Sequence, residues 1–179
     1  MLKYSTNLTA EAVGLTSSAA RGSVPGSLSA SAKAMKDWAE PNLGVGRARF
    51  VDHSGLGAAS HISASEMVKA LQGQPPSAAL RPLLKEVSMR GKDGKPIKNH
   101  PVKIHAKTGT LNFVSGLAGY VTPPNGRELV FAIFAADEPR RAKIPKEQAE
   151  RPDGGRTWLS HARRMQLELI DRWSTVYTT

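Results

Sequence analysis

The chain has no cysteine among its 179 residues, which excludes disulfides, thiolate metal sites and a cysteine nucleophile. Aromatic residues, on which nucleic-acid bases could stack, make up only 6% of the chain. No zinc-finger or RNP-type spacing occurs either. No apolar run reaches the roughly eighteen residues that a membrane-spanning helix needs. A polar run also stands near the start, where a signal peptide would carry its apolar segment. These absences argue against a disulfide-rich, a membrane-spanning or a nucleic-acid-binding protein.

Acidic residues are also few, since 15 Asp and Glu face 25 Lys and Arg, for a formal net charge of +10. Such a charge favours binding to polyanions such as nucleic acids. The basic residues are spread mostly beside glycine and proline, however, which is typical of solvated loops. The 40% hydrophobic content and the length predict a folded globular protein, with residues 1–179 forming one domain around a real core.

Helical patterns dominate the first half of the chain. Apolar spacing and capping residues predict helices over four ranges, 7–22, 27–42, 62–76 and 77–87. Pro41 is expected to end the second helix, and Ser63 with Glu66 has the spacing of a capping box at the third. A short strand running into a glycine-rich loop is expected over 48–60.

The period changes after residue 102. Val, Ile, Phe and Thr predict strands over 102–111, 115–123 and 127–137, and Asn125 with Gly126 supplies the turn of a hairpin. The last strand is apolar on both faces, which predicts packing layers on both sides. A long amphipathic helix is expected over 156–175. Its inward residues are expected to be Trp158, Ala162, Met165, Leu169, Ile170 and Trp173. The order predicts an α+β fold, an antiparallel three-strand meander covered by a C-terminal helix.

The run Lys107-Thr108-Gly109-Thr110 lies on the first of these strands. Because side chains alternate along a strand, Lys107 and Gly109 share one face. Gly109 lets a ligand approach closely, the two threonines add hydroxyls, and the strand edge offers N–H and C=O groups to an extended peptide. A tripeptide also recurs by chance, and a basic strand end is often only solubilising.

Two companions of this motif occur in penicillin-binding proteins and class A β-lactamases, an SxN triplet and an SxxK. Ser5, Thr6 and Asn7 form an SxN triplet at the start of a predicted helix. No lysine of the chain has a serine three positions before it, so the SxxK is absent. Asn7 could equally serve as a helix cap.

Three blocks together resemble the S13 peptidase family, D-Ala-D-Ala carboxypeptidases and endopeptidases of the penicillin-binding-protein-4 type. The matching residues stand in the family's order and cover most of the chain. The first block has Ser5, Asn7, Ala10 and Glu11, the second has Asp52, Ser54, Gly55 and Leu56, and the third has Lys107 to Leu111 with Ala118, Gly119 and Tyr120. His53 stands where the family usually has glycine, and Gly57 where it usually has serine, so no role is assigned to that loop. The Asp52-His53-Ser54 run itself is not read as a triad, because a triad is assembled in space.

The resemblance implies a serine acyl-enzyme mechanism on peptidoglycan stem peptides ending in D-Ala-D-Ala, and binding of β-lactams. In that mechanism Ser5 and Lys107 would relay a proton, and Asn7 would bind the substrate's amide oxygen. The Thr108 and Thr110 hydroxyls would bind the terminal carboxylate, Gly109 would admit the substrate, and the Thr110 N–H would form part of an oxyanion hole. No metal or organic cofactor is implied.

The missing SxxK leads us to expect a chain that is the C-terminal part of a longer protein and is inactive alone. The resemblance also implies a periplasmic location and N-terminal strands beside the last strand. Without those strands, residues 128–137 would present an apolar edge and promote self-association. Two alternatives stay open: a non-catalytic muropeptide-binding or scaffold module, and a basic nucleic-acid-binding domain, against which the sequence argues most clearly.

Overall fold

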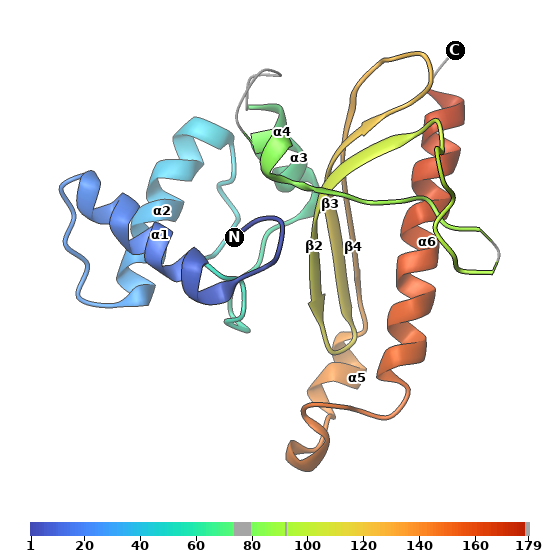
Figure 1. Cartoon of the computed structure of the whole chain (residues 1–179). Helices are drawn as coiled ribbons and strands as arrows, with labels where there is room; N and C mark the ends of the chain where they lie inside the picture. The colour runs from blue at the N-terminus through green and yellow to red at the C-terminus, as the bar shows by residue number, and fades with distance from the viewer. Residues whose placement is uncertain (74–79, 92, 178–179) are drawn as a thin grey trace. The chain divides into compact units, whose positions relative to one another are not determined.

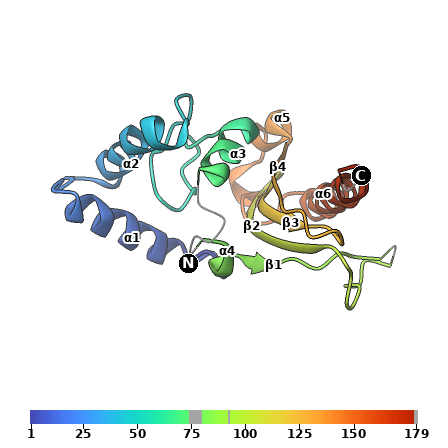
Figure 2. The ribbon, with the colours of Figure 1, turned by 90° about the horizontal axis from the view of Figure 1, so that it is seen from above.

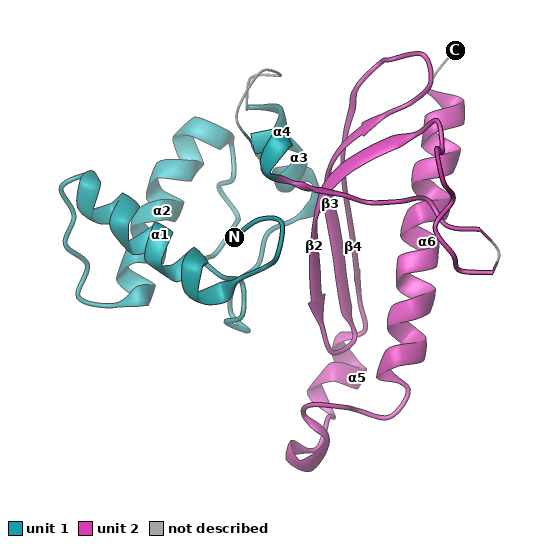
Figure 3. Cartoon of the chain, viewed as in Figure 1, with its two compact units in different colours: residues 1–83 teal, residues 84–179 magenta. Residues whose placement is uncertain are grey.

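The computed structural model describes residues 1–73, 80–91 and 93–177. The chain divides into two compact units, residues 1–83 and 84–179, which Figure 3 shows in different colours. We describe each unit by itself, and the single domain predicted for residues 1–179 stays a prediction. No helix among the described residues is long and apolar enough to cross a membrane.

The first unit is helical, as predicted. Its helices are α1 (Asn7–Ala20), α2 (Leu28–Leu43), α3 (Ala64–Gln72) and α4 (Leu80–Leu83). The predicted capping box of α3 is present, since Ser63 accepts a hydrogen bond from the Glu66 N–H and the Glu66 side chain accepts one from the Ser63 N–H. Pro41 does not end α2, because the helix continues to a left-handed Gly44 whose N–H donates to the Glu40 carbonyl.

The strand expected within 48–60 is reduced to a single bridge, in which Arg49 and His61 exchange two backbone hydrogen bonds of 2.9 and 2.8 Å. Beyond it the Val51 N–H donates to the Ser60 hydroxyl at 3.1 Å. Side chains thus take the backbone donors that a second strand would need.

The second unit is an antiparallel sheet with a helix on one face (Figures 1 and 2). Its strands are β1 (Lys85–Glu86), β2 (Lys103–Leu111), β3 (Val114–Thr122) and β4 (Leu129–Ala136), in the order β1-β2-β3-β4. After β4 come the short helix α5 (Glu138–Ala142), the 3₁₀ turn η1 (Lys146–Gln148) and the long helix α6 (Gly155–Val176). The predicted α+β class and the three-strand meander are confirmed. The helix predicted over 77–87 is wrong at its end, where β1 forms instead, and residues 77–79 lie outside the described part.

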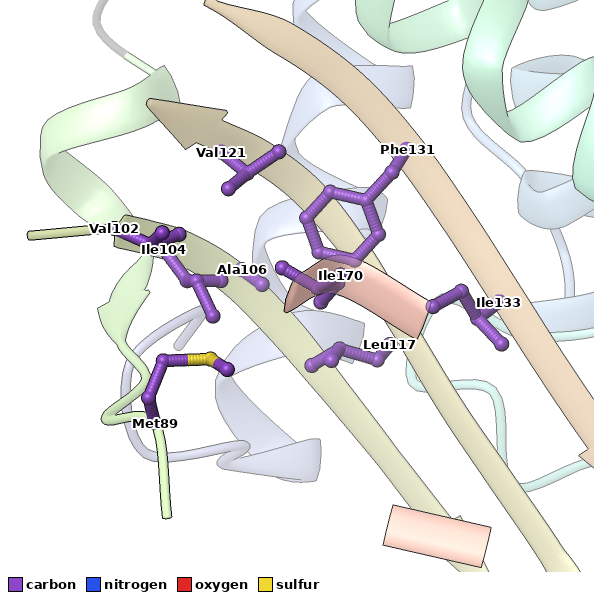
Figure 4. Close-up of a cluster of buried hydrophobic side chains, with 9 residues drawn as sticks. All are labelled: Met89, Val102, Ile104, Ala106, Leu117, Val121, Phe131, Ile133 and Ile170. Carbon is purple, nitrogen blue, oxygen red and sulfur yellow. The ribbon is translucent and has the colours of Figure 1, made fainter. Parts of the chain in front are cut away.

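The core of this unit lies between the sheet and α6. Figure 4 shows its buried side chains, which are Met89, Val102, Ile104, Ala106, Leu117, Val121, Phe131, Ile133 and Ile170. Ile104 and Ala106 point toward α6, so by alternation Thr108 and Thr110 share that face. Lys107 and Gly109 therefore lie on the opposite face, as the sequence predicted for this pair.

Gln166 of α6 lies in the core, although the hydrophobic pattern predicted that only apolar residues of this helix face inward. It is 2% exposed, whereas the predicted core residue Met165 is 39% exposed. Its side chain is hydrogen-bonded to the Ser115 hydroxyl at 3.2 Å and donates to the carbonyls of Ser115 and Ile133 at 3.1 and 3.4 Å. A polar side chain can be buried here because strand groups satisfy it.

We expect Gln166→Leu to lower the free energy of unfolding by about 1–3 kcal/mol, because it strips the buried Ser115 hydroxyl and strand carbonyls of a partner. Urea denaturation followed by circular dichroism measures this loss. The neighbouring exposed residue serves as control, since Met165→Leu should change stability by less than about 0.5 kcal/mol. Equal stability of the two variants would show that the Gln166 hydrogen bonds contribute nothing net.

Candidate active site

The predicted site strand has an open edge next to Lys107. β1 pairs only with His105 and Ala106, so among the described residues of this unit no strand pairs with the rest of β2 on that side. The Val87 N–H donates to the Ile104 carbonyl at 2.9 Å. Since both backbone groups of a residue point the same way in an antiparallel strand, Thr108 and Thr110 direct theirs toward this open edge.

Lys107 is half-buried on the sheet face opposite α6, opposite Ala118 in the register. Burial lowers the pKa of its ammonium group. Its Nζ donates to the Thr108 carbonyl, so the positive charge is held at the open edge. A substrate carboxylate or a proton-accepting group placed along that edge would meet this charge.

Two glycines leave the surface beside Lys107 free of side chains at their positions. Gly109 lies opposite Gly116, and a Cβ added at Gly109 would meet nothing closer than the Gly116 Cα at 4.0 Å. The exposed ring of Phe134 borders Gly116. The two glycines leave room for a ligand backbone to approach the strand.

The turn at the end of β2 is held from three directions. Asn112 Nδ2 donates to the Ala149 carbonyl at 2.5 Å, and Arg141 Nη1 donates to the Asn112 carbonyl at 2.9 Å. Phe113 has a φ of 57° and its ring lies 5.1 Å from the Arg140 guanidinium carbon. A cavity of about 410 Å³ adjoins this turn, lined by residues 110–112 and 150–157 with Leu159.

Ser5 and Asn7 lie together at the start of α1 in the first unit. Ser5 has a left-handed φ of 54°, and its N–H donates to the Met1 carbonyl at 2.8 Å. Such a conformation in a residue other than glycine costs about 1 kcal/mol or more and recurs at functional sites. Thr6 is the N-cap residue of α1 and Asn7 its first helical residue, so the reading of Asn7 as a cap is wrong. Both predicted side chains are exposed.

The structure thus places the predicted residues in two groups. Ser5 and Asn7 belong to the first unit, while Lys107, Thr108, Gly109 and Thr110 follow one another on β2 of the second. Each group is contiguous within its own unit, and the joint action of the two groups stays a prediction.

Glu11 links the first two blocks of the family resemblance, the block around Ser5 and the block around Asp52. Its carboxylate accepts hydrogen bonds from the backbone N–H groups of His53 and Ser54, at 3.1 and 3.0 Å. Asp52 in turn accepts from Gly57 N–H at 2.5 Å and from the Ser60 hydroxyl at 2.9 Å. Glu11 thus holds the 52–57 loop against α1, and Asp52 closes the loop on itself, two structural roles that the sequence reading did not assign.

His53 packs on α1 rather than facing the Asp52 and Ser54 side chains. A Cβ added at Gly14 would lie 2.1 Å from the His53 ring, so the helix admits this ring only because residue 14 is glycine. The ring Nε2 is hydrogen-bonded to the Ser31 hydroxyl at 2.8 Å, and Ser31 to Ser18 at 2.7 Å. Ser31 is 0% exposed, which makes this network part of the packing and not an accessible nucleophile.

The 52–57 loop should make the first unit sensitive to acid. Burial raises the pKa of Asp52, but hydrogen bonds from Gly57, Ser60 and Gly55 outweigh it and the net pKa is lowered. For Glu11, too, burial raises the pKa and the hydrogen bonds from Ser54 and His53 outweigh it. A carboxylate with a lowered folded-state pKa stabilises the fold above its unfolded-state pKa, and this contribution is lost as pH falls through the folded-state pKa.

We therefore expect the first unit to lose stability below about pH 4. Fluorescence of Trp38, the only tryptophan in residues 1–83, reports this in a variant with Trp158 and Trp173 changed to phenylalanine. Asp52→Asn should destabilise the unit at pH 7 and flatten its pH dependence, whereas Asp37→Asn on the exposed side of α2 should do neither. A pH profile that Asp52→Asn leaves unchanged would contradict this account.

Several solved structures share the fold of this chain. Penicillin-binding protein 4 of Haemophilus influenzae, solved with a β-lactam, superposes with a TM-score of 0.64 at 21% identity, over 95% of this chain and 39% of that one. A predatory endopeptidase of Bdellovibrio bacteriovorus gives a TM-score of 0.62 at 16% identity, over 98% of this chain and 43% of that one. A second, solved with an immunity protein, gives 0.57 at 20% identity, over 96% and 42%. The chain thus spans about two fifths of the length of these proteins.

No curated protein sequence matches the chain. A family model matches residues 1–153, however, and is described as the D-Ala-D-Ala carboxypeptidase 3 (S13) family. This range begins before Ser5 and extends beyond β4, so it includes the SxN triplet, the Asp52 loop and the Lys-Thr-Gly strand. The chain belongs to the S13 family of D-Ala-D-Ala carboxypeptidases.

Proposed function

We propose that this chain carries part of the substrate site of a serine-type D-Ala-D-Ala peptidase and binds peptidoglycan stem peptides that end in D-Ala-D-Ala. The observation that carries the proposal is the open edge of β2, where Thr108 and Thr110 point backbone groups outward beside the Lys107 ammonium group. An extended peptide pairs with such an edge through its main chain. Family membership supplies the class of peptide.

Each predicted residue has a role in this proposal. Thr108 and Thr110 bind the terminal carboxylate through their hydroxyls, and the Thr110 N–H donates to the oxyanion of the attacked carbonyl. Ser5 and Lys107 pass a proton to the leaving amine, and Asn7 holds the substrate's amide oxygen. The lowered pKa of Lys107 favours this work, because a lysine that gives up its proton more readily is a better relay.

The attacking serine is not assigned to this chain. No Ser-x-x-Lys occurs in the sequence, and in this family the serine needs its lysine three positions later as an activating group. We therefore propose that the 179-residue chain binds substrate and does not turn it over, and that the complete enzyme acts in the periplasm, where its peptide substrate is found.

Two measurements test this function. In NMR titration with diacetyl-L-Lys-D-Ala-D-Ala, the amide signals of Thr108 and Thr110 should shift, whereas the L-Ala-L-Ala peptide should leave them in place. Intact-mass analysis after incubation with a reactive penicillin should show no adduct. An adduct would mean that a serine of this chain is the nucleophile, and the relay role of Ser5 would have to be withdrawn.

Self-association through β4 is a further part of the proposal. β4 pairs only with β3 among the described residues, and its eight residues, Leu129–Ala136, carry no charge. An apolar edge of this kind pairs readily with a second copy. Sedimentation velocity should show concentration-dependent dimers that Phe134→Lys suppresses and Phe134→Leu does not. A monomer at every concentration would contradict the proposal.

A further inference from the structure

Arg163 of α6 reaches the predicted carboxylate-binding threonine. Its Nη2 donates to the Thr110 hydroxyl oxygen at 3.1 Å, across 53 positions of sequence, and both side chains are exposed. Both residues belong to the second unit, and Thr110 faces α6 by the alternation of β2. A guanidinium group is thus held beside one end of the open strand edge.

This hydrogen bond determines what the Thr110 hydroxyl can do. A hydroxyl has one hydrogen to donate and two lone pairs to accept with, while a guanidinium can only donate. Because Arg163 occupies a lone pair of Thr110, the hydroxyl hydrogen must be directed to some other group that accepts. An ionised carboxylate is such an acceptor, and the guanidinium has further N–H donors to offer the same group.

Among the described residues of the second unit, no acid forms an ion pair with Arg163. The adjacent Arg164, by contrast, pairs with Glu168 at 3.4 Å. Lys107 approaches the edge from the opposite face of the sheet. A carboxylate at this edge would therefore find one cation on each side of the strand.

We propose that Arg163, acting with Thr110, is a specificity-determining residue that selects peptides with a free C-terminal carboxylate. This inference rests on the proposed function and adds to it a residue that neither the sequence motifs nor their spacing indicate. Arg163 takes no part in proton transfer. Its effect should therefore appear in the preference for a carboxylate over a neutral C-terminus.

The test compares two probes, diacetyl-L-Lys-D-Ala-D-Ala and its C-terminal amide, by NMR titration of the full chain. The unaltered chain should bind the acid about tenfold more tightly than the amide, as one charge-assisted contact allows. Arg163→Gln should reduce this preference by weakening acid binding several-fold, about as one lost charge-assisted contact requires, with little change for the amide. Arg163→Lys should keep part of it, because the charge remains without the forked donor geometry.

Arg164→Gln is the matched control, since it makes the same charge change one residue away on the same helix. It should leave both affinities unchanged, and thermal denaturation should show all variants to be equally folded. Acid binding that Arg163→Gln leaves unchanged would overturn the role of Arg163 while the proposed function stands. Failure of the unaltered chain to bind either peptide would overturn the proposed function, and the inference with it.

Discussion

Replacing Lys107 with methionine is expected to weaken binding of the D-Ala-D-Ala peptide by at least about tenfold and, at the same time, to raise the melting temperature of the chain. The loss of affinity follows because the ammonium group donates to the Thr108 carbonyl and so lies at the edge where we propose that the peptide pairs. A charge-assisted hydrogen bond contributes about 1.5–3 kcal/mol, which corresponds to a tenfold to hundredfold change in affinity.

The gain in stability follows from the lowered pKa of Lys107, which burial causes. A lysine whose pKa is lower in the folded state binds its proton more tightly when unfolded, so the charged form opposes folding at all pH values below the folded-state pKa. Methionine has a similar length and no charge, and this opposition disappears. Stability and binding would then change in opposite directions.

Lys103→Met is the control for both effects. Lys103 lies on the same strand and on the same face as Lys107, but it is exposed and far along β2 from the threonines. This change should leave peptide affinity within about twofold and the melting temperature within the range of ordinary surface substitutions. A drop in melting temperature for Lys107→Met would show that contacts of the lysine outweigh the cost of burying its charge.

Gly119→Ala is expected to unfold the second unit, or to lower its free energy of unfolding by about 3 kcal/mol or more. A Cβ at this position would lie 2.2 Å from the His105 carbonyl oxygen and 2.7 Å from the Ala106 Cα. Both are backbone atoms of β2, the strand that carries Lys107. The clash can be relieved only by separating β3 from β2 beside the site.

Gly116→Ala tests whether this cost is specific to the position. Gly116 is on the same strand, and its added Cβ would meet the Phe134 ring at 3.5 Å, an ordinary contact. Urea denaturation should therefore show Gly116→Ala to be near neutral and Gly119→Ala severely destabilised. Gly116→Ala should still weaken peptide binding, since the methyl group would cover the shallow surface opposite Gly109. Similar stabilities of the two variants would contradict the close approach of β2 and β3 at Gly119.

The sheet could be predicted from sequence because its strands are rich in Val, Ile, Phe and Thr, because side chains alternate between the two faces of a strand, and because Asn125 with Gly126 marks a turn. The same alternation placed Lys107 on one face and the two threonines on the other. Two failures have a physical explanation. β1 has only two residues, too short for any periodic pattern, and Gln166 is buried only because groups of β3 and β4 accept and donate hydrogen bonds to it.

The candidate site could be proposed from sequence where its residues form a contiguous run, but not where a residue acts through tertiary contacts. Ser5 and Asn7, like the Lys-Thr-Gly run, could be located from motif spacing. The role of Glu11 depends on backbone N–H groups 42 and 43 positions away, and the role proposed for Arg163 depends on a hydroxyl 53 positions away. The family's Ala-Glu pair after the SxN triplet was the one available signal for Glu11.

The two edges of the sheet differ in how they resist unwanted partners. The β4 edge is apolar and uncharged, whereas the open part of β2 carries Lys107 on one face and the Thr110–Arg163 pair on the other. Charged side chains at an edge discourage chance pairing between strands. An ordinary polypeptide strand that added to β2 would have to place its neutral interior between two cations. The residues that we propose to bind a carboxylate therefore also discourage chance strand pairing at the edge that they leave open.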